Sequence, residues 1–268
     1  MTREVVLSGG NTGLVVRVGD TVRRQRGHWT PAVHALLDHL EAVGFDGAPR
    51  ALGTDAQGRD VTAYVPGVVG TLGPGVLSPQ FRTVEACRAI GAWLRAFHDA
   101  QAGFEPDPAL PWRMVPGRRL EEGEVVVHQD VGTYNTVLRA DGTFAVIDFD
   151  FAAPGQPVED LAYALWSWTP LWGDRDAVER EMGGVGLGER VHKFAALLEG
   201  YAADAPLRAT VCDAVLARMA AQSRTLEDLA AQGDPAFVRM VAEGHAERPR
   251  RDAQWFAAHR ALFEAAVT

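Results

Sequence analysis

Three oxygen-bearing side chains in the middle of the chain have the types and spacing to act on a phosphate group. Asp130 lies in a polar loop, Asn135 precedes an apolar run, and Asp148 ends the next one. An Asp141-Gly142 pair separates the two runs, which predicts a tight β-hairpin. With a two-residue turn, Asn135 would lie opposite Asp148, with Cβ atoms about 5 Å apart. An amide oxygen and a carboxylate at that spacing suit Mg²⁺ bound together with substrate phosphates.

The residues around Asp130 follow the spacing of a phosphoryl-transfer loop. His128, Asp130 and Asn135 match the pattern His-x-Asp-x-x-x-x-Asn. In that pattern the Asp lies near the incoming hydroxyl and the Asn binds a metal ion at the nucleotide phosphates. We interpret His128 as bracing the loop, because this chemistry assigns the proton to the Asp. Asp148 would be the second metal ligand, and Asp150 either a further ligand or a substrate contact.

The segment after the hairpin resembles a known family. Ile147-Asp148-Phe149-Asp150 is followed by Gly155, Pro157 and Asp160-Leu161-Ala162, an order similar to that of the aminoglycoside phosphotransferase-like family of small-molecule kinases. The resemblance implies an α+β, protein-kinase-like bilobal fold. A small antiparallel β N-lobe with one helix, residues 1–67, would bind the nucleotide. A larger, mostly helical C-lobe, residues 68–268, would carry the catalytic loop and the substrate-binding helices. Asp160 would brace the backbone of the catalytic loop.

Residues 3–24 predict three strands whose first turn is rich in glycine. Such a turn lets backbone N–H groups approach phosphates, so Ser8, Gly9 and Gly10 are candidate nucleotide-binding residues, with an ordinary hairpin turn as the alternative. In kinases the third strand carries a phosphate-binding lysine paired with a glutamate on the next helix. The only lysine here is Lys193, so Arg23, or Arg24 as second choice, would take that role. A solvated basic edge strand is the alternative.

The next segment predicts a helix that begins at Thr30 and Pro31. Its apolar stripe is formed by Val33, Leu36, Leu37, Leu40 and Val43. His34 lies where the resemblance would place the glutamate partner, and no acidic residue occurs between Asp20 and Asp38. Either the arginine is held in another way, through Asp38 for example, or activity is reduced or absent.

Two further strands are expected within residues 49–67, before a Gly/Pro-rich lobe boundary at residues 66–79. By resemblance, the backbone of Tyr64 and Val65 would meet the adenine edge. Helices are predicted at residues 80–102, 186–203, 206–231, 234–245 and 249–266. Trp166, Trp168 and Trp172, with the acidic residues after them, are read either as substrate contacts or as core residues before a solvated loop.

Composition limits the function classes. The 268 residues carry a formal net charge of −9 and have a pI near 5.4, which argues against nucleic acid as the main partner. No apolar run approaches the ~20 residues of a membrane span. The first residues lack the apolar core of a signal peptide, so a cytoplasmic monomer or homodimer without a membrane partner is expected. Cys87 and Cys212 predict two reduced, buried thiols.

The sequence therefore predicts an ATP- or GTP-dependent kinase that uses Mg²⁺ and phosphorylates a hydroxyl of a small molecule. An antibiotic of the aminoglycoside or nucleoside type is the expected substrate, with resistance as the outcome. One alternative is a kinase-shaped immunity protein that sequesters a compound without modifying it. Another is a metabolic kinase for choline, a sugar or homoserine. Substrate contacts in this fold come from variable helices and loops, so these alternatives stay open.

Overall fold

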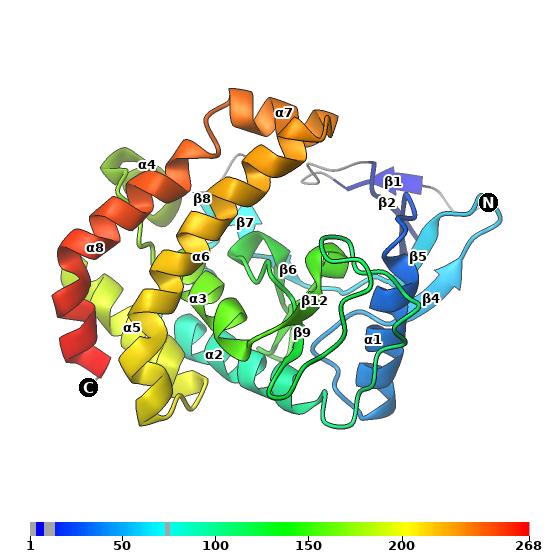
Figure 1. Cartoon of the computed structure of the whole chain (residues 1–268), viewed down its shortest axis with the longest axis horizontal. Helices are drawn as coiled ribbons and strands as arrows, with labels where there is room; N and C mark the ends of the chain where they lie inside the picture. Colours follow the sequence, from blue (N-terminus) through cyan, green and yellow to red (C-terminus); the bar gives the residue numbers. More distant parts are fainter. Residues whose placement is uncertain (1–3, 8–13, 73–75, 268) are drawn as a thin grey trace. The chain divides into compact units, whose positions relative to one another are not determined.

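The computed structural model describes residues 4–7, 14–72 and 76–267 (Figure 1). Ser8, Gly9 and Gly10 lie outside the described residues. The chain divides into two compact units, which are described separately. The first comprises Met1–Val68, Ala96–Asp130 and Asn135–Pro157, and the second Val69–Arg95, Val131–Tyr134 and Val158–Thr268.

An antiparallel sheet and one helix form the N-terminal part of the first unit, as the sequence predicts. The strand order is β1-β2-β3-β5-β4. In the register of β3 and β5, Arg24 lies opposite Asp60, which fixes two charged residues side by side at one end of the sheet. The strands are β1 (Glu4–Val6), β2 (Val16–Val18), β3 (Thr21–Arg24), β4 (Ala51–Thr54) and β5 (Asp60–Ala63).

Helix α1 (Thr30–Ala42) begins where the sequence predicts, with Pro31 in its first turn. Proline is favoured there because its missing N–H would have no intrahelical partner. The buried stripe consists of Val33, Leu36, Leu37 and Leu40, whereas Val43 is an exposed C-cap residue outside the helix. The helix thereby presents one apolar face to the core and leaves His34 at the flank of that face.

The remaining strands of the first unit carry the predicted loop and hairpin. They are β9 (Val125–Val127), β10 (Thr136–Leu138), β11 (Phe144–Val146) and β12 (Ala153–Gly155), with the short helices η2 (Thr133–Asn135) and η3 (Phe149–Phe151) between them. Strand β9 pairs with β12, and β10 pairs with β11 and with β6 (Val68–Val69). Val126, Val127, Ala145 and Val146 are fully buried, so the hairpin and the strand before Asp130 rest on a rigid apolar core.

The second unit is mostly helical, in agreement with the predicted fold class. Its helices include α3 (Pro157–Trp168), α4 (Arg175–Met182), α5 (Leu187–Gly200), α6 (Ala205–Ala231), α7 (Pro235–Ala242) and α8 (Glu247–Val267). Helix α2 (Val84–Asp99) begins in it, and η1 (Pro79–Phe81) and the pair β7 (Thr71–Leu72) and β8 (Val76–Leu77) precede α2. The charged helix α4, which the sequence pattern does not predict, starts at Asp174, whose carboxylate accepts a hydrogen bond from the N–H of Ala177.

Helices α2 and α5 approach each other at glycine. A Cβ atom added to Gly91 would lie 2.1 Å from the carbonyl oxygen of Leu197, and one added to Gly200 would lie 1.9 Å from that of Arg88. Only a residue without a Cβ permits this backbone separation. The packing of these two helices therefore depends on two specific glycines.

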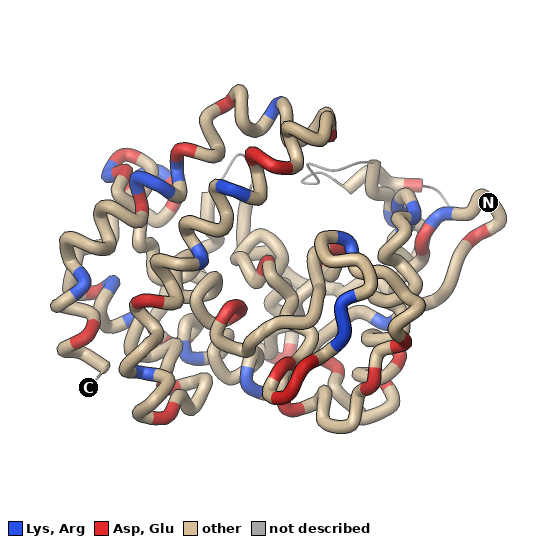
Figure 2. The backbone as a smooth tube through the Cα atoms, viewed as in Figure 1, with Lys and Arg blue, Asp and Glu red and all other residues tan. Residues whose placement is uncertain are grey.

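Two features of the described residues bear on solvent and membrane contact. The side chain of Lys193, on α5, is 1% exposed and pairs with Glu189 at 2.9 Å. None of the described helices combines the length and the apolar character that crossing a membrane would need. Acidic and basic residues are distributed over both units (Figure 2).

Candidate active site

The hairpin of β10 and β11 forms, but its register differs by one residue from the prediction. Thr136 pairs with Val146, and the N–H of Arg139 donates to the carbonyl oxygen of Thr143 at 2.9 Å. The loop thus has three residues and ends in Gly142, with φ of 83°. A three-residue loop with a left-handed glycine is the next commonest hairpin connection after the two-residue turn.

The shifted register changes the neighbours of Asn135. Its carbonyl oxygen accepts a hydrogen bond from the N–H of Ile147 at 2.8 Å, so Ile147 and not Asp148 lies opposite it. The predicted direct pairing of Asn135 with Asp148 is therefore wrong. Asp148 follows the ladder and adopts a left-handed backbone conformation, with φ of 68° and ψ of 65°. Such a conformation is costly for a residue other than glycine and tends to occur at functional sites.

Asp130 and Asn135 are in direct contact. The Nδ2 atom of Asn135 donates to Oδ2 of Asp130 at 2.9 Å and to its carbonyl oxygen at 3.1 Å. With Nδ2 assigned as the donor, the other terminal atom of the Asn135 side chain is the oxygen Oδ1. An amide oxygen is a hard ligand in its chemical type. The loop is closed on itself by these bonds, so the carboxylate of Asp130 has a defined direction.

His128 lies beneath the loop and is fully buried. Its Nδ1 atom accepts from the N–H of Asp130 at 3.3 Å, and its Nε2 atom lies 3.2 Å from the carbonyl oxygen of Ile147. The ring also packs on Phe149, with centroids 4.4 Å apart. Accepting at Nδ1 fixes the neutral tautomer with the proton on Nε2. These contacts join the loop to the end of the hairpin, which is the geometry of a bracing residue.

Arg24 connects the sheet to the segment that follows the hairpin. Its Nη1 atom lies 2.7 Å from Oδ1 of Asp148, and its Nη2 atom lies 2.7 Å from Oδ1 of Asp150. Its Nε atom donates to Oδ2 of Asp60 at 2.9 Å. A guanidinium group presents its N–H donors in a rigid plane, so one side chain can bind three carboxylates in fixed directions.

Burial and charge act against each other on this cluster. Burial alone would lower the pKa of Arg24, but the carboxylates of Asp150, Asp148 and Asp60 raise it above its ordinary value. For Asp150 burial acts in the opposite direction and raises the pKa. The charge of Arg24 lowers this pKa, the charge of Asp148 raises it, and the net result is a raised pKa. The arginine is therefore permanently charged, and Asp150 is the carboxyl group in this cluster with the raised pKa.

The structure places Arg24, and not Arg23, beside Asp148. The Nη1 atom of Arg23 lies 3.4 Å from Asp55, in the turn between β4 and β5. Successive residues of a strand point to opposite faces of the sheet, so Arg23 and Arg24 lie on different faces. Arg24, the second choice from the sequence, is the arginine of the candidate site.

The carboxylate that holds Arg24 comes from a neighbouring strand and was not predicted. Asp60, at the start of β5, is 2% exposed and binds His34 of α1 through its other oxygen, with Nε2 to Oδ1 at 2.6 Å. His34 thus contacts Arg24 only through Asp60. The sequence offered no signal for Asp60, because it lies 36 residues from Arg24 and only the pairing of β3 with β5 brings the two together.

A second arginine approaches Asp150 from the loop before β9. The Nη1 atom of Arg113 lies 3.9 Å from Oδ2 of Asp150. Its guanidinium carbon lies 4.4 Å from the ring centroid of Trp29 and 4.6 Å from that of Phe151. Cation–π contacts of this kind fix the arginine in place. Asp150 is therefore held from two sides, whereas the side chain of Asp148 is 45% exposed.

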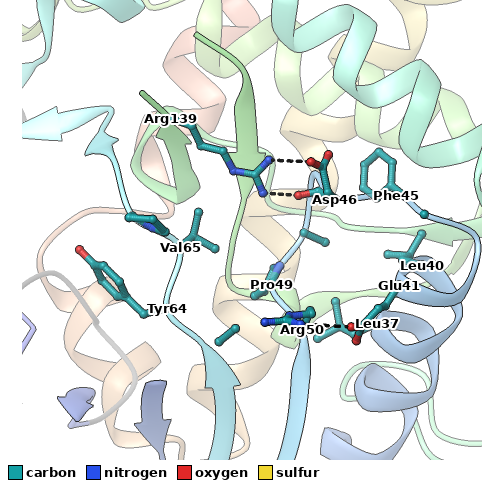
Figure 3. A pocket seen from close by; sticks show the side chains of 14 residues that line it. Leu37, Leu40, Glu41, Phe45, Asp46, Pro49, Arg50, Tyr64, Val65 and Arg139 are labelled. Atoms are coloured by element: carbon teal, nitrogen blue, oxygen red, sulfur yellow. Dashed lines mark hydrogen bonds and ion pairs between the residues drawn. The ribbon is translucent and has the colours of Figure 1, made fainter. Parts of the chain in front are cut away.

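Tyr64 and Val65 line a pocket of about 360 Å³ in the first unit (Figure 3). Apolar side chains line it together with two arginines whose guanidinium groups are paired, Arg139 with Asp46 and Arg50 with Glu41. The lining includes none of the cluster around Arg24 and Asp130, so this pocket is separate from the candidate site. The N–H of Tyr64 already donates to the carbonyl oxygen of Asp20 at 2.9 Å.

The tryptophans of α3 are core residues. The Nε1 atom of Trp166 donates to Asp252 at 3.0 Å, and that of Trp168 donates to the carbonyl oxygen of Val131 at 3.1 Å. Trp172, after the helix, stacks against Arg248 at 4.5 Å. Asp160 is fully buried in the first turn of α3, as a structural carboxylate would be. Of the two roles considered for these tryptophans, that of a core residue therefore applies to Trp166 and Trp168.

The first unit offers a metal ion few protein ligands. Within residues 4–7, 14–72 and 76–267, no group of three or more His, Cys, Asp or Glu side chains is placed to hold an ion. Mg²⁺ at kinase sites uses one or two protein oxygens together with phosphates and water. Asn135 and the exposed carboxylate of Asp148 fit that smaller requirement.

The chain is also similar in sequence to known proteins. Residues 108–197 match the phosphotransferase enzyme family (APH). Over 280 aligned residues, 100% of this chain and 100% of its relative, the sequence is 34% identical to the trifolitoxin immunity protein of Rhizobium leguminosarum bv. trifolii. The chain belongs to the aminoglycoside phosphotransferase-like family.

Two solved structures of kinases have a similar fold. A choline/ethanolamine kinase family protein from Mesorhizobium loti has a TM-score of 0.61 and 18% identity, over 99% of this chain and 92% of that one. The amicoumacin kinase hAmiN, in complex with AMP-PNP, Ca²⁺ and Ami, has a TM-score of 0.60 and 14% identity, over 84% of this chain and 81% of that one. At these identities the likeness concerns the fold alone, so the substrate must be argued from the site.

Proposed function

We propose that the protein transfers the γ-phosphoryl group of ATP or GTP to a hydroxyl of a small toxic compound and so protects the cell against it. The observation that carries the proposal is the contact between Asp130 and Asn135 at 2.9 Å, in the same unit in which Arg24 binds Asp148 at 2.7 Å. One compact unit therefore contains a base candidate, two metal-ligand candidates and a fixed cation for phosphate.

In this proposal Asp130 orients the substrate hydroxyl and accepts its proton. The hydroxyl oxygen forms a bond to the γ-phosphorus, the bond from that phosphorus to the β,γ-bridging oxygen breaks, and a nucleoside diphosphate leaves. An ordinary carboxylate suffices, because the loose transition state of phosphoryl transfer needs little basicity from the enzyme. The hydrogen bonds from Asn135 keep the carboxylate directed, which is the positional part of the catalysis.

Asn135 and Asp148 would hold Mg²⁺, with Asp150 behind them as a contact to Arg24. The metal, when bound, would neutralise charge on the nucleotide phosphates. Arg24 would bind a phosphate oxygen, the role of lysine in other kinases, through charge-assisted hydrogen bonds. Tyr64 and Val65 stay predictions for the adenine contact, as do Ser8, Gly9 and Gly10 for the phosphates.

A second candidate function is immunity by sequestration without phosphorylation. The full-length relative is named as an immunity protein against trifolitoxin, and the replacement of the usual lysine by Arg24 alters the nucleotide site. The two functions differ in one requirement, since sequestration needs no nucleotide. Thermal stabilisation by Mg-ATP or Mg-GTP therefore separates them, and stabilisation by neither nucleotide would favour sequestration.

The direct test is a mass-spectrometric search for the gain of one phosphoryl group. Aminoglycosides, nucleoside antibiotics, peptide toxins and metabolic alcohols would each be incubated with the protein and Mg-ATP or Mg-GTP. With the compound that reacts, Asp130→Ala should lower kcat about 10²- to 10⁴-fold, the usual contribution of a positioned acid or base. Asp148→Ala should abolish turnover. Asp38→Ala should leave it unchanged, because Asp38 is exposed on α1 and the carboxylate that holds Arg24 is that of Asp60. Turnover near the parental rate in both site variants would contradict the mechanism.

A further inference from the structure

We infer that His34 and Asp60 are positioning residues that aim the guanidinium group of Arg24 at the phosphates, in place of a lysine–glutamate pair. The role of Arg24 in this inference rests on the proposed function. The part played by His34 and Asp60 rests on contacts within the first unit. Neither residue needs to touch substrate or nucleotide to act in this way.

Asp60 is fixed on both sides. Its Oδ2 atom accepts from Nε of Arg24 at 2.9 Å, and its Oδ1 atom faces Nε2 of His34 at 2.6 Å. With 2% exposure, it has little access to water. A buried carboxylate with a donor on each oxygen cannot rotate without losing one of them. Its direction is therefore set jointly by β3 and α1.

Because Asp60 binds Nε, the two terminal nitrogens of Arg24, which lie in the same guanidinium plane, are left to bind other groups. They contact Asp148 and Asp150, each at 2.7 Å. These two carboxylates alone would be expected to draw the arginine wholly toward the hairpin, because each adds a full charge at close range. The carboxylate of Asp60, on strand β5, attracts the guanidinium group toward the sheet instead. The arginine is thus held between two groups, and its Nη atoms stay at the place where Asp148 meets a nucleotide phosphate in the proposed reaction.

The arrangement explains why the helix contributes a histidine. In kinases the helix supplies a glutamate that binds the lysine of the third strand directly. Here the carboxylate has moved to the adjacent strand, at Asp60, and a second carboxylate at position 34 would repel it. His34 instead donates to Asp60, so that the helix is still linked to the phosphate-binding cation. A lysine at position 24 could not reproduce this geometry, because its single nitrogen cannot serve three separated carboxylates with planar donors.

The competing explanation is that the contacts among Arg24, Asp60 and His34 only hold the sheet to the helix. The two explanations differ in which kinetic constant changes. A structural role predicts that less protein folds, and that the folded fraction binds nucleotide and acceptor as the parental protein does. A positioning role predicts weaker nucleotide binding, with the acceptor KM unchanged, in protein that is folded.

The test compares His34→Ala, His34→Gln and Asp60→Asn with a matched control, His39→Gln. His39 lies on the same helix and binds the carbonyl oxygen of Ala100 at 3.0 Å. Asp60→Asn should weaken Mg-nucleotide binding about tenfold and His34→Ala about fivefold. His34→Gln should restore most of the loss, since its amide can donate to Asp60. The control should match the parental protein, and circular dichroism spectra should show that all four variants are folded.

Nucleotide affinity is measured by titration calorimetry, without an acceptor, so the test does not require the substrate. Parental affinity in both His34→Ala and Asp60→Asn would overturn the inference and leave the proposed function standing. A parental protein that binds neither Mg-ATP nor Mg-GTP would overturn the proposed function and this inference with it. Equal losses in His34→Ala and His34→Gln would also overturn it, because donation to Asp60 would then not be the property that matters.

Discussion

The contact between α2 and α5 allows one substitution to be tested with opposite expected signs at two sites. Gly91→Ala would place a Cβ atom 2.1 Å from the carbonyl oxygen of Leu197 and 2.9 Å from the N–H nitrogen of Tyr201. Both are backbone atoms, which cannot turn away as a flexible side chain can. The two helices must therefore separate locally. Gly188, in the first turn of α5, has nothing within 4 Å of its added Cβ.

The size of the effect follows from two opposing contributions. Overpacking of this kind costs about 3 kcal/mol at its upper end. Alanine is favoured over glycine within a helix by about 1 kcal/mol. Gly91→Ala should therefore lower the free energy of unfolding by about 2 kcal/mol, or Tm by about 4–8 °C for a chain of this size. Gly188→Ala should raise the free energy of unfolding by about 0.5 kcal/mol, because it only restricts the unfolded chain.

The measurement is urea-induced unfolding of both variants and the parental protein, followed by circular dichroism. Because two compact units can unfold separately, the transition that reports helix loss is the relevant one. A Gly91→Ala variant at least as stable as the parental protein would show that α2 and α5 do not pack as closely as described. Loss of stability in Gly188→Ala would show that the two sites are not a valid pair.

Three further predictions concern single residues. Burial raises the pKa of Asp60, but His34 and Arg24 together lower it by more, so the pKa lies below its ordinary value. The contribution of Asp60 to stability is then present above about pH 4 and is lost as the pH falls through the lowered pKa. Asp60→Asn should therefore make the free energy of unfolding depend less on pH on the acid side. Burial raises the pKa of the Cys87 thiol to about 12 and that of Cys212 to about 11, so neither should react with a thiol reagent at pH 8 until the protein unfolds. Gly142→Ala should lower the free energy of unfolding by about 1 kcal/mol in chemical denaturation, because the hairpin loop requires a left-handed residue there.

The long helices and the kinase-like class could be predicted from the sequence because their signals extend over many residues. Helix α6 was expected at residues 206–231 and runs over Ala205–Ala231. Its period of 3.6 residues repeats often enough to outweigh local exceptions. Helix α4 has only eight residues, which are mostly polar, so its amphipathic pattern is too short to detect.

The errors at the site have a common physical origin. The partner of Asn135 depends on whether the hairpin loop has two or three residues. The face of the sheet that carries the phosphate-binding candidate depends on whether that residue is Arg23 or Arg24. Strands repeat every two residues, so an uncertainty of one residue reverses the outcome. Asp60 is a case of a different kind, because only the pairing of β3 with β5 brings it to Arg24. Motif spacing predicts Asp130, Asn135 and Asp148 as site residues, but it does not decide which arginine binds Asp148.

The burial of Lys193 has a consequence for chemical proteomics. It is the only lysine in the 268 residues, and its side chain is 1% exposed. In the proposed site, a nucleotide probe that acylates an amine beside the terminal phosphate would meet the guanidinium group of Arg24, which stays protonated and is a poor nucleophile. A survey that detects kinases by such labelling would pass over this protein even if it turned over substrate at full rate.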